Sequence, residues 1–184
     1  MDRMKIEQGV RLILEGIGED LTREGLVDTP QRVVELCAEI FDGLGSDPLE
    51  KLKLYSTKNE DELILVRDIS FHSICEHHLL PFFGKVHIAY VPAKDRITGF
   101  SSLARVVNLF SHRPQLQERL TTDIADALVE ALRPRGVLVV IEAEQLCMAM
   151  RGIKKPGILT MTSAVRGVFR QEATRMEAFS MIMG

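Results

Sequence analysis

One continuous apolar run constrains the fold of this chain more than any other feature. Residues 137–141 read Val-Leu-Val-Val-Ile, without a polar position. Strands with one solvent-facing side alternate polar and apolar residues, so an unbroken, mostly β-branched run predicts a buried strand. The preceding residues, 133–136, read Arg-Pro-Arg-Gly and predict the end of a helix. The rest of the chain must therefore fit around a sheet with helical neighbours.

The remaining segments divide into helical and extended patterns. Apolar residues recur at helical spacing in residues 4–17, 29–41, 101–111, 115–132 and 172–183, whereas residues 63–66, 85–91 and 158–169 are extended. The longest helix carries an apolar stripe that predicts a core face, formed by Leu116, Leu120, Ile124 and Leu128. Thr29 is predicted to cap the second helix, with Pro30 in its first turn. Cys37 lies on the apolar face of that helix and is expected in the core.

The order of these elements indicates the fold class. Runs of strands followed by runs of helices predict an α+β fold, in which an antiparallel sheet carries helices on one face. We expect an N-terminal helical region at residues 1–58 and a sheet-containing domain at residues 59–184. A small antiparallel sheet leaves edges to cover, and assembly with further copies of the chain is one way to cover them.

Charge and composition argue against two classes of partner. The net charge is −3, Trp is absent, and aromatic residues make up 5% of the chain. Neither a strongly basic chain nor stacking platforms are indicated, so we expect no nucleic-acid partner. The first residues carry charges of both signs, and no window approaches the roughly 18 consecutive apolar residues of a membrane span. We therefore expect a cytoplasmic protein with no membrane partner.

The strongest local signal is Cys-Glu-His-His at residues 75–78. This spacing lets the thiolate of Cys75 and the imidazole of His78 reach one metal ion, although a buried thiol and a hydrogen-bonded surface histidine remain open as alternatives. Cys147 follows the buried strand and is well placed to complete the site. Two thiolates and one imidazole would leave the fourth tetrahedral position of zinc open, as in catalytic centres. His77 would then be free to move protons.

Several separated motifs resemble the GTP cyclohydrolase I family. The resemblance is carried by Cys75–Phe82, Gly84–Tyr90, Arg113–Leu120 and Cys147–Gly152, preceded by Arg23–Leu26, Thr29-Pro30 and Arg32-Val33. The motifs occur in the family's order, and the similarity extends from about residue 5 to residue 180 without large gaps. Several motifs in the right order are far more specific than any one of them.

This resemblance implies an architecture and a reaction. The architecture is a tunnelling fold, in which the sheets of neighbouring subunits close into a barrel, and a homodecamer of two stacked pentamers with active sites between subunits. The cofactor is zinc, and the substrate is GTP, which is converted to 7,8-dihydroneopterin triphosphate and formate by hydrolytic opening of the guanine imidazole ring. The product would feed tetrahydrofolate synthesis or a related pterin or deazapurine pathway. Residues 59–184 would be the catalytic domain.

Site residues carry over from the family by position. The zinc ligands correspond to Cys75, His78 and Cys147. His77 matches the histidine thought to protonate the purine, and Glu118 matches the carboxylate that reads guanine through N1–H and the 2-amino group, with Gln117 beside it. The triphosphate contacts correspond to Ser101, Arg105 and Arg151, and to Arg32 from an adjacent subunit. Without the family, the sequence favours a solvated helix carboxylate for Glu118 and ordinary surface groups for the phosphate residues.

Two positions depart from the family's pattern. Gln145 stands where the family usually has His, and Ser102 stands where it usually has Lys. A glutamine forms hydrogen bonds but does not take up or release a proton near pH 7. If the departures are tolerated, Gln145 occupies a catalytic position in the ordinary reaction. The alternative is altered chemistry, which stops at a formylamino-pyrimidine nucleotide or uses another guanine nucleotide. A third alternative, a non-catalytic nucleotide- or pterin-binding copy, is opposed by the retained zinc-site residues.

Overall fold

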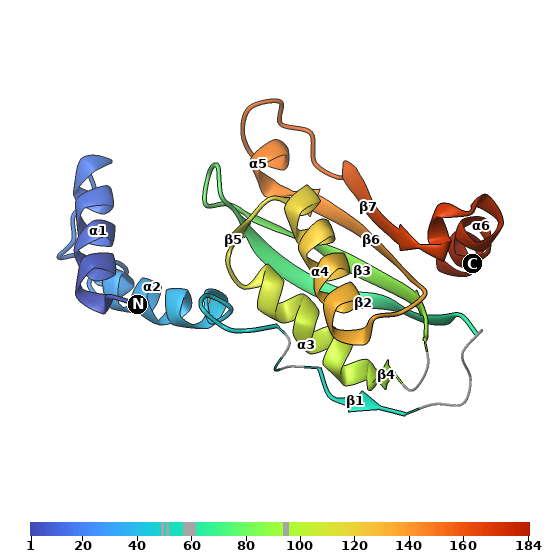
Figure 1. The fold of residues 1–184 in the computed structure, drawn as a ribbon. Coiled ribbons are helices and arrows are strands. Elements are labelled where there is room, and N and C mark those ends of the chain that lie inside the picture. The colour runs from blue at the N-terminus through green and yellow to red at the C-terminus, as the bar shows by residue number, and fades with distance from the viewer. Residues whose placement is uncertain (49, 51, 57–61, 94–95) are drawn as a thin grey trace. The chain divides into compact units, whose positions relative to one another are not determined.

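The chain folds into two compact units, Met1–Asp42 and Gly43–Gly184. The computed structural model describes residues 1–48, 50, 52–56, 62–93 and 96–184 (Figure 1). The domain boundary expected between residues 58 and 59 lies outside the described residues. Within the described ranges, no helix has the length and apolar character needed to cross a membrane.

The first unit is a pair of helices, α1 (Arg3–Gly16) and α2 (Thr29–Ile40). The predicted cap of α2 is wrong by one residue, because Asp28 occupies the N-cap position and Thr29 already belongs to the helix. No side-chain hydrogen bond caps this end; a proline in the first turn removes a backbone N–H that would otherwise need a partner. Cys37 is half-buried, and burial raises the pKa of its thiol.

The second unit is built on a five-stranded sheet in the order β5-β2-β3-β6-β7. The strands are β2 (Ile64–Cys75), β3 (Pro81–Val91), β5 (Pro114–Gln115), β6 (Gly136–Gln145) and β7 (Leu159–Gly167). All neighbours pair antiparallel except β5, which runs parallel to β2. A separate two-stranded sheet joins β1 (Leu54–Tyr55) to β4 (Ile97–Thr98). The fold is thus α+β as predicted, with an antiparallel-rich sheet that has one parallel edge.

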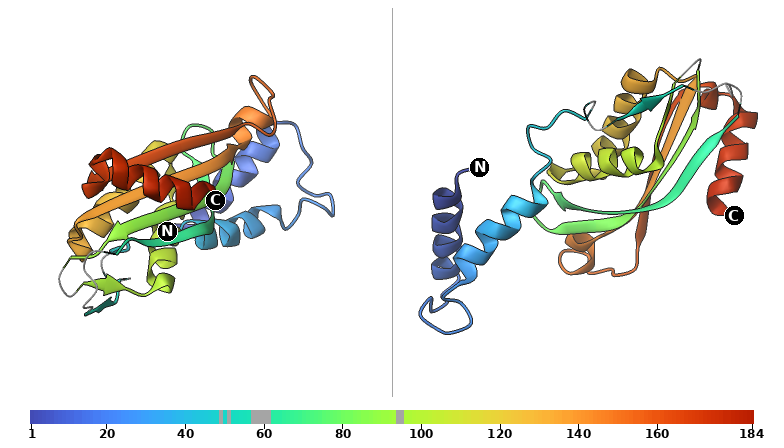
Figure 2. Two further views of the ribbon diagram at one scale, coloured as in Figure 1. Left: turned by 90° about the vertical axis from the view of Figure 1, so that its right-hand side faces the viewer. Right: turned by 90° about the horizontal axis from the view of Figure 1, so that it is seen from below.

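Two helices, α3 (Phe100–Ser111) and α4 (Gln117–Leu132), cover one face of the sheet (Figure 2). Three members of the predicted apolar stripe have no exposed surface (0%): Leu120, Ile124 and Leu128. Burying a leucine or isoleucine side chain in this way contributes about 1.5–3 kcal/mol. Leu116 precedes α4 as its N-cap and is half-buried, so the stripe begins one turn later than expected.

The opposite face is also covered by a helix, so the expectation of helices on one face only is wrong. α6 (Glu172–Met183) and the 3₁₀ turn η2 (Val168–Arg170) pack on the end of the sheet away from α5 (Leu146–Ala149) (Figure 2). This second core contains Ala89, Val91, Leu138, Val140, Phe169, Ala178 and Ile182. The physical reason is the run at residues 137–141: it is apolar at every position, so both faces of β6 need cover.

The sheet brings three distant segments together at one end. β2 ends at Cys75, and β6 ends at Gln145, directly before α5. Between them, β3 begins at Pro81, and Phe82 lies opposite Gln145 in the β3–β6 register. The first turn of α4 faces the same end, because β5 joins the edge of β2 just before that helix begins. This end of the sheet holds the candidate site.

Candidate active site

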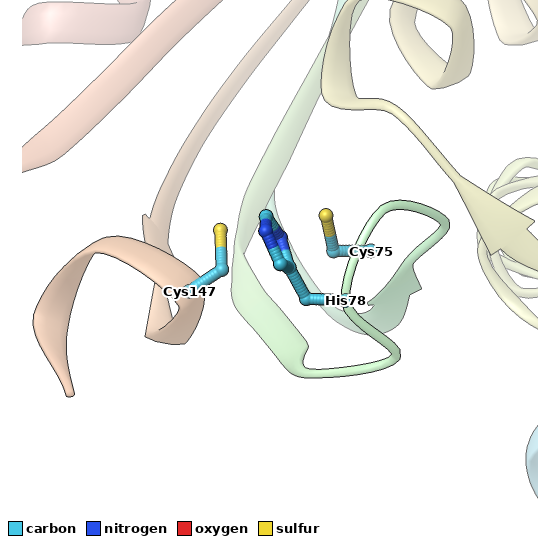
Figure 3. Close-up of side chains that lie close together, drawn as sticks. All are labelled: Cys75, His78 and Cys147. Atoms are coloured by element: carbon cyan, nitrogen blue, oxygen red, sulfur yellow. The ribbon is translucent and has the colours of Figure 1, made fainter. Parts of the chain in front are cut away.

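A tight turn after β2 orients the first two candidate metal donors. The backbone N–H of Cys75 donates to Leu80 O at 2.9 Å, and the N–H of Leu79 returns to Cys75 O at 2.9 Å. Leu79 adopts a left-handed conformation (φ 54°) that allows the chain to reverse so quickly. The turn leaves the side chains of Cys75 and His78 pointing the same way (Figure 3).

The third donor comes from the other side of β3. α5 starts immediately after Gln145, and Cys147 is its second residue. The donor atoms of Cys75, His78 and Cys147 all lie within 4.8 Å of one another. Figure 3 shows the two sulfur atoms on either side of the imidazole ring. The structure therefore brings together the three residues that the sequence indicated as metal ligands.

The chemistry of this donor set fits a metal ion, and zinc in particular. Sulfur and imidazole nitrogen are donors that zinc prefers, and three protein donors leave one tetrahedral position open. Burial, followed by the proximity of Cys75, raises the pKa of Cys147. Two adjacent thiolates are thus unfavourable on their own, and a divalent cation between them reverses that preference.

The donors adjoin a cavity of about 220 Å³. It is lined by Cys75, His77, Phe82, Gln115, Leu116, Gln117, Glu118, Gln145, Cys147, Met148, Thr160 and Thr162. His77 is exposed, and its ring centre lies 6.1 Å from that of His78. An imidazole there can exchange protons with a molecule in the cavity while its neighbour serves as a ligand. The cavity thus collects most of the catalytic and base-reading residues expected from the sequence.

The side-chain amide of Gln117 is buried (5% exposed) and bonded on both sides. Its Nε2 donates to Ile141 O at 3.1 Å, Thr160 O at 3.0 Å and Thr162 Oγ1 at 3.2 Å. Its Oε1 accepts from Thr160 Oγ1 at 2.6 Å and from Gln145 Nε2 at 2.8 Å. Backbone carbonyls only accept hydrogen bonds, so these contacts fix which end of the amide is which. Gln117 therefore ties α4 to β6 and β7 instead of presenting a free amide.

The orientation of Gln145 follows from that of Gln117. Because Oε1 of Gln117 can only accept, Gln145 must direct its own Nε2 toward it. The Oε1 of Gln145 then remains as an acceptor beside the cavity that this residue lines. Position 145 thus supplies a neutral hydrogen-bonding group of fixed polarity.

Glu118 is exposed in the first turn of α4, where the helix dipole favours a carboxylate. The next residue, Arg119, donates to both carboxylate oxygens of Glu76, at 2.5 and 3.2 Å. These hydrogen bonds hold the pKa of Glu76 below its usual value. Glu118 has no comparable side-chain partner in the described ranges, so its carboxylate is available to a ligand in the cavity that it lines.

The expected phosphate residues lie outside this cavity lining. On α3, Arg105 Nη2 lies 3.3 Å from the hydroxyls of both Ser101 and Ser102, and Ser102 is buried (2% exposed). Arg151 follows α5 and is exposed. Arg32 belongs to the other compact unit. The cavity lining thus includes Cys75, Cys147 and the residues expected to contact the base, but none of the expected phosphate residues Ser101, Arg105, Arg151 and Arg32.

Several residues of the site were not predicted from the sequence. Thr160 and Thr162 face the cavity from β7, and Glu76 and Arg119 join the metal-donor turn to α4. Strand alternation predicts that Thr160 and Thr162 share a face. Which amide their hydroxyls reach depends on the register of segments far apart in the chain.

The fold and the site together define the class of an enzyme with a candidate metal centre: three convergent donors that could hold a metal ion adjoin a cavity that also holds an imidazole and an available carboxylate. The family model described as GTP cyclohydrolase I matches residues 6–183. The chain belongs to this family.

Curated relatives agree along nearly the whole chain. The GTP cyclohydrolase 1 of Carboxydothermus hydrogenoformans is 61% identical over 183 residues, covering 99% of this chain and 95% of that protein. The enzyme of the same name from Pelotomaculum thermopropionicum is 59% identical (100% and 98% covered), and that from Bacillus subtilis is 57% identical (94% and 91%). The chain is also similar to a crystal structure of the archaeosine synthase QueF-Like in the apo form, and the match covers 57% of this chain and 93% of that one. Its TM-score against this chain is 0.45, and the sequence identity is 16%.

Proposed function

We propose that this protein is a zinc-dependent GTP cyclohydrolase I, which opens the guanine imidazole ring of GTP and yields 7,8-dihydroneopterin triphosphate and formate. The observation that carries the proposal is the convergence of Cys75, His78 and Cys147 beside the cavity that Glu118 and His77 also line. Membership of the GTP cyclohydrolase I family supports the same reaction.

The metal centre would be held by the two cysteines and His78. When bound, zinc supplies Lewis-acid activation of water near neutral pH. His77 is exposed beside the cavity and not among the three donors, so its imidazole would carry protons to and from the purine ring. Phe82 and Leu116 supply apolar lining, which limits the water around the reacting base.

Base selection would rest on Glu118. Its carboxylate can accept hydrogen bonds from both N1–H and the 2-amino group of guanine, a pair of donors that adenine lacks. Gln117 would act beside it by holding the start of α4 against β6 and β7, since its own amide is fully bonded. Gln145 would contribute a hydrogen-bond acceptor close to the metal donors.

Triphosphate binding and assembly complete the proposal. Ser101, Arg105 and Arg151 would contact phosphates, together with Arg32 of a neighbouring subunit. β7 is the last strand of the described sheet, so its outer edge is where a further strand could pair. A homodecamer of two pentamers, with tunnelling-fold sheets closed into barrels, would cover this edge and bring phosphate residues to each cavity.

The proposal is tested by incubating zinc-loaded protein with GTP and measuring formate and product mass together. One formate per GTP, with the mass of dihydroneopterin triphosphate, is the expected result. A product that retains the formyl group, without free formate, would contradict it and indicate a reaction that stops early. Unchanged GTP would contradict it outright. ATP is the matched control and should remain unchanged.

Gln145→His is the variant that shows whether position 145 sets the product. A protonated ring nitrogen can also donate to Gln117 Oε1, so we expect the same product and the same formate yield from both proteins. A higher rate in the variant would show that Gln145 limits turnover. A formyl-retaining product from the wild type only would show that Gln145 alters the chemistry.

A further inference from the structure

The metal donors and the base-reading carboxylate are joined by their immediate neighbours in the sequence. Glu76 directly follows the donor Cys75, and Arg119 directly follows Glu118. The guanidinium of Arg119 holds both carboxylate oxygens of Glu76 in a two-point contact. This contact spans the space between the turn after β2 and the first turn of α4.

A backbone contact reinforces the same junction. The N–H of Glu76 donates to Gln115 O at 3.1 Å, next to the parallel pairing of Cys75 with Gln115. The Gln115 side chain is itself buried (1% exposed) and fixed: its amide reaches Asp123 Oδ2 of α4 at 3.1 Å, and its oxygen accepts from Leu116 N at 3.2 Å. The turn is thus attached to a rigid support, and the ion pair adds a side-chain contact to the first turn of α4.

We propose that Glu76 and Arg119 are positioning residues that clamp the metal-donor turn to the first turn of α4. Paired guanidinium and carboxylate groups define orientation as well as distance, because two parallel hydrogen bonds permit little rotation. The clamp holds His78 and Cys75 in the geometry that the third donor requires. This inference rests on the proposed function for its catalytic part only.

The clamp is distinct from an ordinary stabilising contact. Arg119 and Glu76 side chains are 50% and 30% exposed, and ion pairs of such exposure contribute little to global stability. Their effect should therefore appear at the site rather than in the unfolding transition. Small misplacements of reacting groups reduce rates far more than they reduce stability.

The experiment compares two clamp variants with a matched ion pair on the same helix. Glu76→Gln removes the charge with little change of shape, and Arg119→Lys keeps the charge but loses the two-point geometry. The control is Asp126→Asn, which breaks the 2.8 Å contact between Asp126 of α4 and Arg166 of β7, outside the cavity lining. For each protein we would measure zinc affinity by competition with a chromophoric chelator, kcat and KM for GTP, and the thermal midpoint.

The clamp predicts that Glu76→Gln and Arg119→Lys each weaken zinc binding and lower kcat about 10-fold or more, with thermal midpoints like that of Asp126→Asn. Three results would overturn it. In the first, both variants match Asp126→Asn in zinc affinity and kcat. In the second, Arg119→Lys matches the wild type while Glu76→Gln does not, which would mean that charge alone matters. In the third, zinc affinity and kcat fall only in proportion to a lowered thermal midpoint, which would make the pair an ordinary stabilising contact.

The zinc measurement also separates this inference from the proposed reaction. If the wild type leaves GTP unchanged, the proposed function fails, but the zinc affinities of the wild type and its three variants still decide whether the clamp exists. If the wild type releases formate and the clamp variants bind zinc as the control does, the function stands and the clamp fails.

Discussion

Two cavities of the second unit have about the same volume, 220 Å³ each, but hold their polar groups in different ways. In the candidate active site, Gln115 and Gln117 are buried and every polar contact of their amides is fixed. The second cavity, beside η2 and the start of α6, is lined by Leu63, Val91, Arg135, Val168, Gln171, Thr174 and Glu177, of which the charged members are exposed. Volume alone thus does not make a reaction site; groups held in place by a supporting layer do.

Among variants of the two cavities, Cys147→Ala in the candidate active site is expected to have the largest effect on activity. Removing one of three donors should abolish both metal binding and GTP turnover, because two remaining donors hold zinc weakly. Metal content after dialysis and formate release are the measurements. Cys37→Ala, in the other compact unit, is the matched control and should keep both. Full activity in Cys147→Ala would invalidate the metal assignment.

Glu118→Ala should give the next largest effect. Loss of a charged acceptor that pairs with two guanine donors should reduce kcat/KM for GTP roughly 100-fold or more, while zinc content stays unchanged. Glu130→Ala, an exposed carboxylate further along α4, serves as the control. If both variants bind and convert GTP equally well, Glu118 is a solvated helix residue.

Thr160→Val tests the supporting layer, by which we mean the fixed amides of Gln115 and Gln117 and the groups that bind them. It removes the hydroxyl that donates to Gln117 Oε1 at 2.6 Å, so the amide loses one partner and stability should fall by about 1 kcal/mol. A loss of a few-fold in kcat/KM should accompany it, because the start of α4 is held less firmly. Thr160→Ser keeps the hydroxyl and should rescue most of both effects in denaturant unfolding and turnover assays. If Thr160→Val and Thr160→Ser have the same stability and kcat/KM, the hydrogen bond from Thr160 to Gln117 does not support the site.

The smallest effect is expected in the second cavity. Glu177→Gln changes an exposed charge with no fixed contact in the described part of the chain, so kcat/KM and the free energy of unfolding should stay within about 0.5 kcal/mol of the wild type. A marked fall in kcat/KM would contradict this prediction, since it would show that a residue of the second cavity affects the reaction in the first.

Much of the fold could be predicted from the sequence, because apolar periodicity reports burial directly. The final helix at residues 172–183 is observed with the predicted bounds. β2 continues well past the predicted residues 63–66 and ends at Cys75. The prediction stopped too early because the pairing register shifts between Val66 and Ile69, where Asp68 adopts a positive φ of 62°. A bulge of this kind interrupts the two-residue alternation on which the prediction depends. The two-residue strands β1, β4 and β5 are too short to show any alternation.

The candidate site also has a part that could be predicted from the sequence and a part that could not. The spacing of Cys75 and His78 predicted a metal site, because both donors belong to one short turn of the chain. The bonds of Gln117 to Thr160 and Thr162, and of Arg119 to Glu76, join segments more than 40 positions apart. Such contacts depend on the relative placement of strands and helices, which periodicity does not specify. The supporting layer of a site is therefore harder to predict than its reacting groups.

The position of the three metal donors has a consequence for folding as well as for chemistry. Cys75 and Cys147 lie at opposite ends of a long segment that contains β3, α3, α4 and β6. A bound ion would close that segment into a ring, as a disulfide does, and restrict the unfolded chain. Chelation should then lower the thermal midpoint and first release amide protons in the turn at residues 75–80. The catalytic ion would serve as a reversible cross-link of the catalytic unit.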